Sequence, residues 1–188
     1  KNLAGGDALI VPLRLYPEAV ARGLAVITET TRRFVEAAVE TGVDGIFYGV
    51  QHAQAGVLTR EEYTAFSLPA DRTALEPAKS LWCNLLHLHG LNIYFDLLTH
   101  YSSLFPIVNW HDRETPPSLS EAQKVFDGVV CGGMSQDTLV YRGRPEVQAE
   151  AADAIAQTGG RRFLLGTGCV VPVIASHGNL LAACRSVE

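Results

Sequence analysis

The sequence lacks a surplus of positive charge. It has 15 Lys and Arg against 20 Asp and Glu, which gives a net charge of -5 at pH 7. Proteins that bind nucleic acid usually present a basic patch to the phosphates, so this charge argues against a nucleic-acid partner. No apolar run approaches the roughly 20 residues that a bilayer-spanning helix needs, and no signal peptide precedes the first apolar segment. We therefore expect a cytoplasmic protein that acts on a small-molecule substrate away from membranes.

Cysteine is scarce and scattered. Cys83, Cys131, Cys169 and Cys184 lie far apart, mostly inside apolar segments. Such cysteines are more often buried free thiols than disulfide partners. The chain also lacks short-period repeats and low-complexity segments, and its composition, 47% hydrophobic and 19% charged, is that of a folded globular protein.

Apolar runs of strand length alternate with amphipathic segments of helical period along the chain. Buried strands are expected over 43–50, 81–90, 104–110, 129–135 and 162–171, and helices over 17–41, 59–68, 92–101, 118–126, 145–158 and 177–187. Pro17 opens the first long helix and Gly42 follows its end, while Ser118 and Glu121 have the spacing of a capping box. The unit of strand, loop and helix thus recurs about five times.

This alternation predicts an α/β fold with a parallel sheet covered on both faces. A complete (β/α)8 barrel takes about 250 residues, so five units in 188 residues indicate a partial barrel. We expect a single domain over residues 1–188, with 1–16 as a lead-in segment. Because the chain opens on Lys1 and a partial barrel leaves open sheet edges, we expect it to be completed by a missing N-terminal half or covered in a homodimer.

The segment LWCNLLHLHG at 81–90 ends in two histidines at positions i and i+2. On a strand the side-chain period is two, so His87 and His89 point to the same side at the carboxyl end. The distant segment RRFLLGTGCVVP carries a thiol, Cys169, directly after Gly168 at the end of another strand-like run. If both strands belong to one parallel sheet, these three side chains meet at one edge. Two imidazoles and a thiolate with an open position suit a catalytic Zn²⁺.

Other polar residues follow predicted strands, where parallel α/β folds collect their active-site groups. We expect catalytic roles for His52, His111 and Asp112, and substrate contacts from Gln54 and Trp110. The alternative for each is an ordinary rim residue.

Two further candidates concern backbone and carboxylate groups at the same edge. Gly132 and Gly133 would admit a substrate's close approach, although glycine there equally suits a tight turn. Metal-bound imidazoles usually pass their second N–H to an acceptor, for which Asp112 and Glu114 are candidates.

Several segments, in order and spacing, resemble the uroporphyrinogen decarboxylase superfamily. They are VDGIFY (43–48), AQAGVLTREEYTAFSLP (53–69), HLHG (87–90), IVNWHD (107–112), VVCGGMS (129–135), RPEVQAEAADAIAQTGG (144–160) and GTGCVVP (166–172). The superfamily includes the decarboxylase of haem biosynthesis and zinc-dependent corrinoid:thiol methyltransferases. The resemblance implies a (β/α)8 barrel of which this chain is the C-terminal part.

In the methyltransferase branch the first metal motif reads His-x-Cys-Gly and the second contains Gly-Cys. His87 matches the first ligand and Cys169 the thiolate of the second motif, whereas His89 stands in place of the Cys. The resemblance implies Zn²⁺ as cofactor and a corrinoid as one candidate methyl donor. Replacing a thiolate by His89 leaves more positive charge on the site, which also admits an activated water as nucleophile.

The decarboxylase branch fits less closely. It carries Gly-His-Gly in the second motif and a substrate-binding Ser where this chain has Ala53. Its essential Asp and Arg pair belong to the N-terminal half of the family's chain, and the rim arginines here, Arg60, Arg113 and Arg142, do not match its pattern. We expect metal-dependent methyl transfer to a thiol; the alternatives are a uroporphyrinogen III decarboxylase-type lyase with its Asp outside this chain, and a non-catalytic fragment.

Overall fold

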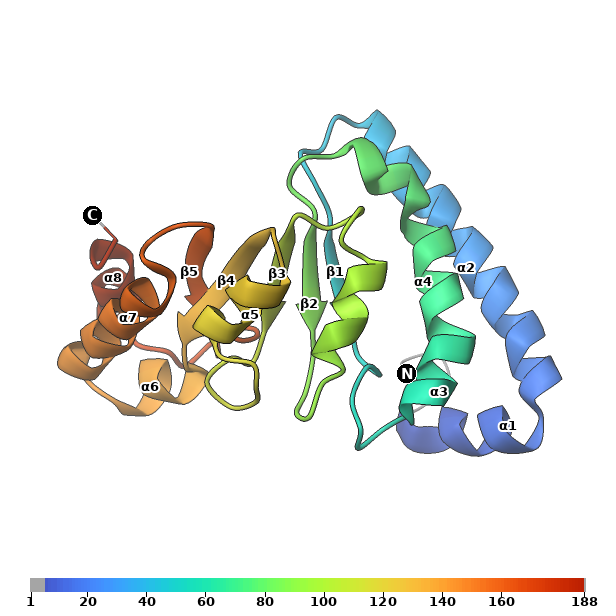
Figure 1. Cartoon of the computed structure of the whole chain (residues 1–188), viewed down its shortest axis with the longest axis horizontal. Coiled ribbons are helices and arrows are strands. Elements are labelled where there is room, and N and C mark those ends of the chain that lie inside the picture. Colours follow the sequence, from blue (N-terminus) through green and yellow to red (C-terminus); the bar gives the residue numbers. More distant parts are fainter. Residues whose placement is uncertain (1–5, 188) are drawn as a thin grey trace.

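A computed structural model describes residues 6–187 and contains one five-stranded sheet (Figure 1). All neighbouring strands are parallel, and their order in space is their order in the chain. The strands are β1 (Phe47–Val50), β2 (Leu85–Leu88), β3 (Ile107–Trp110), β4 (Val129–Met134) and β5 (Phe163–Thr167). An unreversed order is typical of barrels and differs from doubly wound sheets, whose order switches at the centre.

Helical segments connect the strands, so the predicted alternation of five β/α units is confirmed. The α-helices are α1 (Ile10–Leu15), α2 (Pro17–Glu40), α3 (Arg60–Glu62), α4 (Leu68–Leu75), α5 (Leu119–Val125), α6 (Gln136–Tyr141), α7 (Arg144–Thr158) and α8 (His177–Arg185). A π-helical turn, Tyr63–Ser67, joins α3 to α4, and 3-10 turns span Gly6–Leu9, Glu76–Ser80 and Phe95–His100. Helices α2 and α4 run alongside each other beside β1, whereas α6, α7 and α8 gather at the β5 end (Figure 1).

Local sequence signals explain where several helices begin and end. Ser118 and Glu121 form the predicted reciprocal capping box at the start of α5, and Thr59 and Glu62 form another at α3. Helix α2 ends just before Gly42, whose φ of 79° is one that glycine adopts without strain.

The two faces of the sheet differ in chemistry because side chains alternate along each strand. Leu86, Val108 and Val130 are fully buried on the helix-covered face. The neighbours of these residues along each strand point to the opposite face. They include His87 of β2 and Asn109 of β3, which are register partners. The apolar core therefore lies behind the sheet, and the polar groups lie on its inner face.

Several elements differ from the sequence-based expectation. Residues 6–15, which belong to the expected lead-in segment, are helical, and helix α6 was not anticipated. Strand β2 covers only four residues of the predicted 81–90. Phe34 on α2 is 74% exposed, whereas its neighbour Val35 is the buried residue of this helix.

The sheet has two open edges in the part of the chain that the structure describes, because β1 and β5 each pair on one side only. Near these edges the inner face exposes apolar side chains such as Phe47 and Leu164. Within residues 6–187, no helix combines the length and apolar content needed to cross a membrane.

Candidate metal centre

Four potential metal ligands meet at the carboxyl edge of the sheet. His87 lies in β2, His89 follows it by two residues, His111 directly follows β3, and Cys169 lies two residues beyond β5. Register pairs His87 with Asn109, and the same offset brings His89 beside His111. The parallel sheet thus brings together residues up to 82 positions apart.

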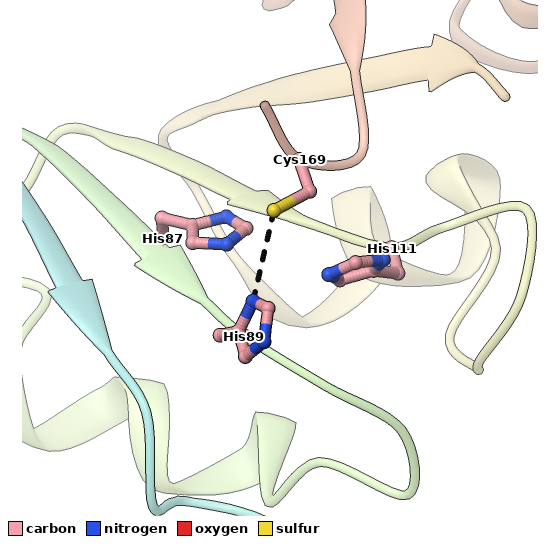
Figure 2. A group of neighbouring side chains, drawn as sticks. All are labelled: His87, His89, His111 and Cys169. Atoms are coloured by element: carbon pink, nitrogen blue, oxygen red, sulfur yellow. Dashed lines mark hydrogen bonds between the residues drawn. The ribbon is translucent and has the colours of Figure 1, made fainter. Parts of the chain in front are cut away.

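The donor atoms of these four residues all lie within 4.8 Å of one another. Figure 2 shows the three imidazole rings and the thiol pointing toward one another, with His89 Nδ1 3.6 Å from Cys169 Sγ. The ring centroid of His89 lies 5.3 Å from that of His111 and 5.7 Å from that of His87. The structure therefore gathers the three predicted ligands, His87, His89 and Cys169, and adds His111, for which a catalytic role is expected.

The donor set has the features that a metal ion would satisfy. His87 Nε2 and both ring nitrogens of His111 are buried and have no hydrogen-bond partner. Buried polar atoms of folded proteins nearly always have a partner, so such atoms gathered at one point call for an explanation. Imidazole nitrogen and thiolate sulfur are the preferred ligands of Zn²⁺. The residues present fit this ion.

Asn109 fixes the proton of His87. Its amide nitrogen donates to the carbonyl oxygens of Cys131 (2.9 Å) and Thr167 (3.0 Å), so its Oδ1 is the atom that faces His87 Nδ1 at 2.7 Å. An amide oxygen can only accept, so Nδ1 of His87 carries the proton. The lone pair of Nε2 is therefore directed into the cluster, as metal binding requires.

Electrostatics keep His87 neutral. Burial lowers its pKa to about 4, an effect that the hydrogen bond to Asn109 opposes and the nearby His111 and His89 reinforce. A neutral imidazole is the form that binds metals, so this ring needs no proton removed near pH 7.

The surroundings support two of the other ligands. Gln54 Nε2 donates to the backbone oxygens of Gln51 (2.8 Å) and His89 (3.2 Å), and packs beneath Gly90, whose φ is 96°. The carboxylate of Glu114 lies 3.4 Å from His111 Nδ1. Gln54 thus anchors the segment that carries a ligand, and Glu114, one of the two expected acceptors, is the one beside a cluster imidazole.

Asp112, Gly132 and Gly133 lie together where β3 ends beside β4. The Asp112 carboxylate accepts from Gly133 N at 3.0 and 3.1 Å, and burial raises its pKa. A Cβ atom on Gly132 would stand 2.4 Å from Asp112 Oδ1. The absence of a side chain on Gly132 thus makes room for the Asp112 carboxylate, which ties the two strands together through Gly133 N, whereas a Cβ on Gly133 would meet Ala154 Cβ at 2.4 Å. A catalytic role for Asp112 stays a prediction.

Two other predicted site residues lie apart from the cluster. Trp110 is fully buried on the helix-covered face, where its ring packs against Phe95 and its Nε1 donates to Pro117 O at 2.9 Å. Alternation along β3 turns it away from His111, so any influence on the site would act through packing. His52 lines a separate cavity beside β1.

Sequence reasoning missed Asn109 as a supporting residue. The available signal was parity, because Asn109 stands two residues before His111 in a strand and so shares its face. Its hydrogen bond to His87 depends on the register between β2 and β3, which cannot be read from the sequence.

A solved structure described as a methyltransferase from Methanosarcina mazei has a similar fold, with a TM-score of 0.81 and 18% sequence identity. The similarity covers 97% of this chain and 52% of the methyltransferase, so this chain spans about half of that protein's length. No curated protein matches this sequence.

The five parallel β/α units therefore form part of a (β/α)8-type barrel. The sequence pattern of the family described as uroporphyrinogen decarboxylase (URO-D) matches residues 5–188, nearly the whole chain. The chain belongs to the uroporphyrinogen decarboxylase family.

Proposed function

We propose that this chain carries the metal centre of a metal-dependent methyltransferase that moves a methyl group from a small donor or a corrinoid to a thiol. The observation that carries the proposal is the cluster of three imidazoles and one thiol, whose donor atoms lie within 4.8 Å of one another. The fold similarity to a methyltransferase agrees with it.

We assign His87, His89 and Cys169 as the residues that hold Zn²⁺. Two neutral imidazoles and one thiolate leave the ion with a net positive charge, so a thiol bound in the fourth position would be strongly acidified. A site with all four side chains bound would be closed, whereas catalysis needs an open position.

His111 is the donor best placed to act on the substrate. Its Nδ1 lies 3.4 Å from the Glu114 carboxylate, whose charge would favour a proton on that side of the ring, and neither ring nitrogen has a hydrogen-bond partner. In the proposed step, the thiol S–H proton passes to His111 Nε2. The sulfur then forms a bond to the methyl carbon as the carbon–donor bond breaks, and that bond's electron pair leaves with the donor.

Decarboxylation of a tetrapyrrole fits this edge less well, because it needs cationic groups for the substrate's carboxylates. Arg60 binds Asp96 and lies over the Tyr94 ring. Arg113 is engaged by Asp153 and by the backbone oxygens of β4 and α7. Neither guanidinium is available to the cluster without breaking these contacts.

The proposal is tested by zinc content and by methyl transfer to a thiol, measured on the full-length protein and its single variants. We expect about one zinc per chain, lost in His87→Ala, His89→Ala and Cys169→Ala. His111→Ala should keep the zinc and lower the rate of thiol methylation about 100-fold or more.

Three results would contradict parts of this account. A folded protein free of zinc would remove the metal centre, and loss of zinc in His111→Ala would indicate a closed four-ligand site. Release of CO₂ from uroporphyrinogen by the full-length protein would favour the decarboxylase instead.

A further inference from the structure

A cavity of about 500 Å³ opens beside the edge strand β1, and it shares no lining residue with the metal centre. We call it the β1-edge pocket. Its walls come from β1, the loop after it, the π-helical turn and helix α4. It is lined by Tyr48, Gly49, Val50, Gln51, His52, Tyr63, Ser67 and Asp71. Short π-helical turns inside helices often occur at functional sites.

One carboxylate in this pocket accepts hydrogen bonds from three phenols. Tyr48 donates to Asp71 Oδ1 at 2.6 Å, and Tyr63 and Tyr101 donate to Oδ2 at 3.0 and 2.7 Å. The hydroxyls of Tyr63 and Tyr101 lie 2.5 Å apart, and both side chains are 1% exposed. Three phenols, from β1, the π-helical turn and the segment after Phe95–His100, thus converge on one acidic side chain.

The phenols can act only as donors to this group at ordinary pH. Burial, and then the nearby Asp71 charge, raises the pKa of Tyr48, Tyr63 and Tyr101. The phenol hydroxyls that reach both carboxylate oxygens favour the ionised form of Asp71, because an ionised carboxylate only accepts; the short Tyr63–Tyr101 contact shares one of their protons.

The negative charge of Asp71 has no cationic counterpart among the side chains that the structure describes. No ion pair among them includes Asp71. Burial raises the pKa of Asp71 while the three phenols oppose the shift, so the ionised form carries a cost. Buried charges in folded proteins are normally paired, and a cation entering the adjoining cavity would supply the missing partner.

We infer that the β1-edge pocket binds a small organic ammonium group, with the Asp71 carboxylate as its counter-ion. A metal cation is a poorer match, because in the described part of the chain only the His and Cys cluster gathers three or more metal-binding side chains. The cavity volume lies within the usual range of small-molecule pockets, about 300–1,000 Å³. The phenol oxygens and the Ser67 hydroxyl are further acceptors for N–H groups.

The experiment titrates the full chain with propylammonium chloride and follows binding by NMR, with 1-propanol and potassium chloride as matched probes. We expect saturable binding of propylammonium alone. Asp71→Asn, which keeps the size of the side chain and removes its charge, should weaken it at least tenfold. Asp127→Asn, at an exposed position, is the control and should leave it unchanged.

Ser67→Leu provides a second variant that does not touch the buried carboxylate. Its larger side chain should occupy part of the cavity and weaken propylammonium binding at least tenfold while the fold is kept, as judged by the NMR spectrum. Equal affinity in Asp71→Asn, saturation by 1-propanol or potassium to the same degree, or no saturable binding of propylammonium would each overturn the inference.

Discussion

The role of Asn109 yields the sharpest prediction, because one side chain makes three hydrogen bonds with separate consequences. Its Oδ1 holds the proton of His87 on Nδ1, and its amide nitrogen links β4 and β5 through the carbonyl oxygens of Cys131 and Thr167. In Asn109→Ala the imidazole loses its acceptor and two carbonyl oxygens lose their donor.

The size of both effects follows from these contacts. Each buried group left without a partner costs about 1–3 kcal/mol, and solvent entering the space of the missing side chain offsets part of this, so we expect the free energy of unfolding to fall by about 2–4 kcal/mol. Loss of the residue that orients a metal-bound histidine typically costs about 10–100-fold in metal affinity. We therefore expect zinc to bind about 10–100-fold more weakly.

The assay is a chelator competition for zinc on folded protein, with urea unfolding of the metal-free protein alongside. Nitrogen-15 NMR of the His87 ring should find the proton on Nδ1 in the wild type and a mixture of tautomers in Asn109→Ala.

Asn179→Ala is the matched control, because Asn179 is also buried and donates to two carbonyl oxygens, those of Leu139 and Arg142. It should lose similar stability and keep its zinc affinity. Zinc affinity of Asn109→Ala within twofold of the wild type would refute the orienting role.

Other predictions follow from the same edge of the sheet. Burial, reinforced by the Asp112 charge, raises the pKa of the Cys131 thiol to about 11, so its alkylation by iodoacetamide at pH 8 should be about 100-fold slower than that of a thiol of ordinary pKa. This pKa is higher in the folded chain than in the unfolded chain. The protonated thiol therefore contributes its full stability below about pH 9, and this contribution declines as the pH rises toward 11. Cys131→Ser should flatten the plot of unfolding free energy against pH in this range. Gly132→Ala places a Cβ 2.4 Å from Asp112 Oδ1, so calorimetry should find a loss of about 1–3 kcal/mol, and unchanged stability would contradict the close packing.

The parts of the fold that depend on local sequence were predictable. The capping box of Ser118 and Glu121 predicted the start of α5, and the alternation of apolar runs with helical segments predicted a parallel sheet. Element lengths were less accessible. Strand β2 is short because pairing with both neighbours stops at Leu88, which depends on the partner strands and leaves no mark in LWCNLLHLHG.

The candidate site was predictable where it depends on the alternation of side chains along a strand and on the positions of the strand ends. The i, i+2 spacing of His87 and His89 placed both on one face, and the following strands brought Cys169 to the same edge. His111 was noticed for its position after a strand, but its distance from the cluster depends on the register between β2 and β3.

Trp110 illustrates the opposite limit. Its position at the end of a strand predicted a substrate contact. However, Trp110 and His111 are consecutive residues, so the alternation that brings His111 to the cluster turns Trp110 to the buried face. The carboxylate of Asp71 and its three tyrosines could not be foreseen, because Tyr48 and Tyr101 reach it from segments separated from α4 by loops of unpredictable course.

The central claim is that Cys169 and the histidines at the strand ends share one metal ion. X-ray absorption at the zinc edge of the purified full-length protein tests it most directly. The account predicts about one zinc per chain with a single sulfur neighbour and the remaining ligands nitrogen or oxygen, and loss of the sulfur neighbour in Cys169→Ser. A zinc shell without sulfur in the wild type, or one unchanged by Cys169→Ser, would contradict it.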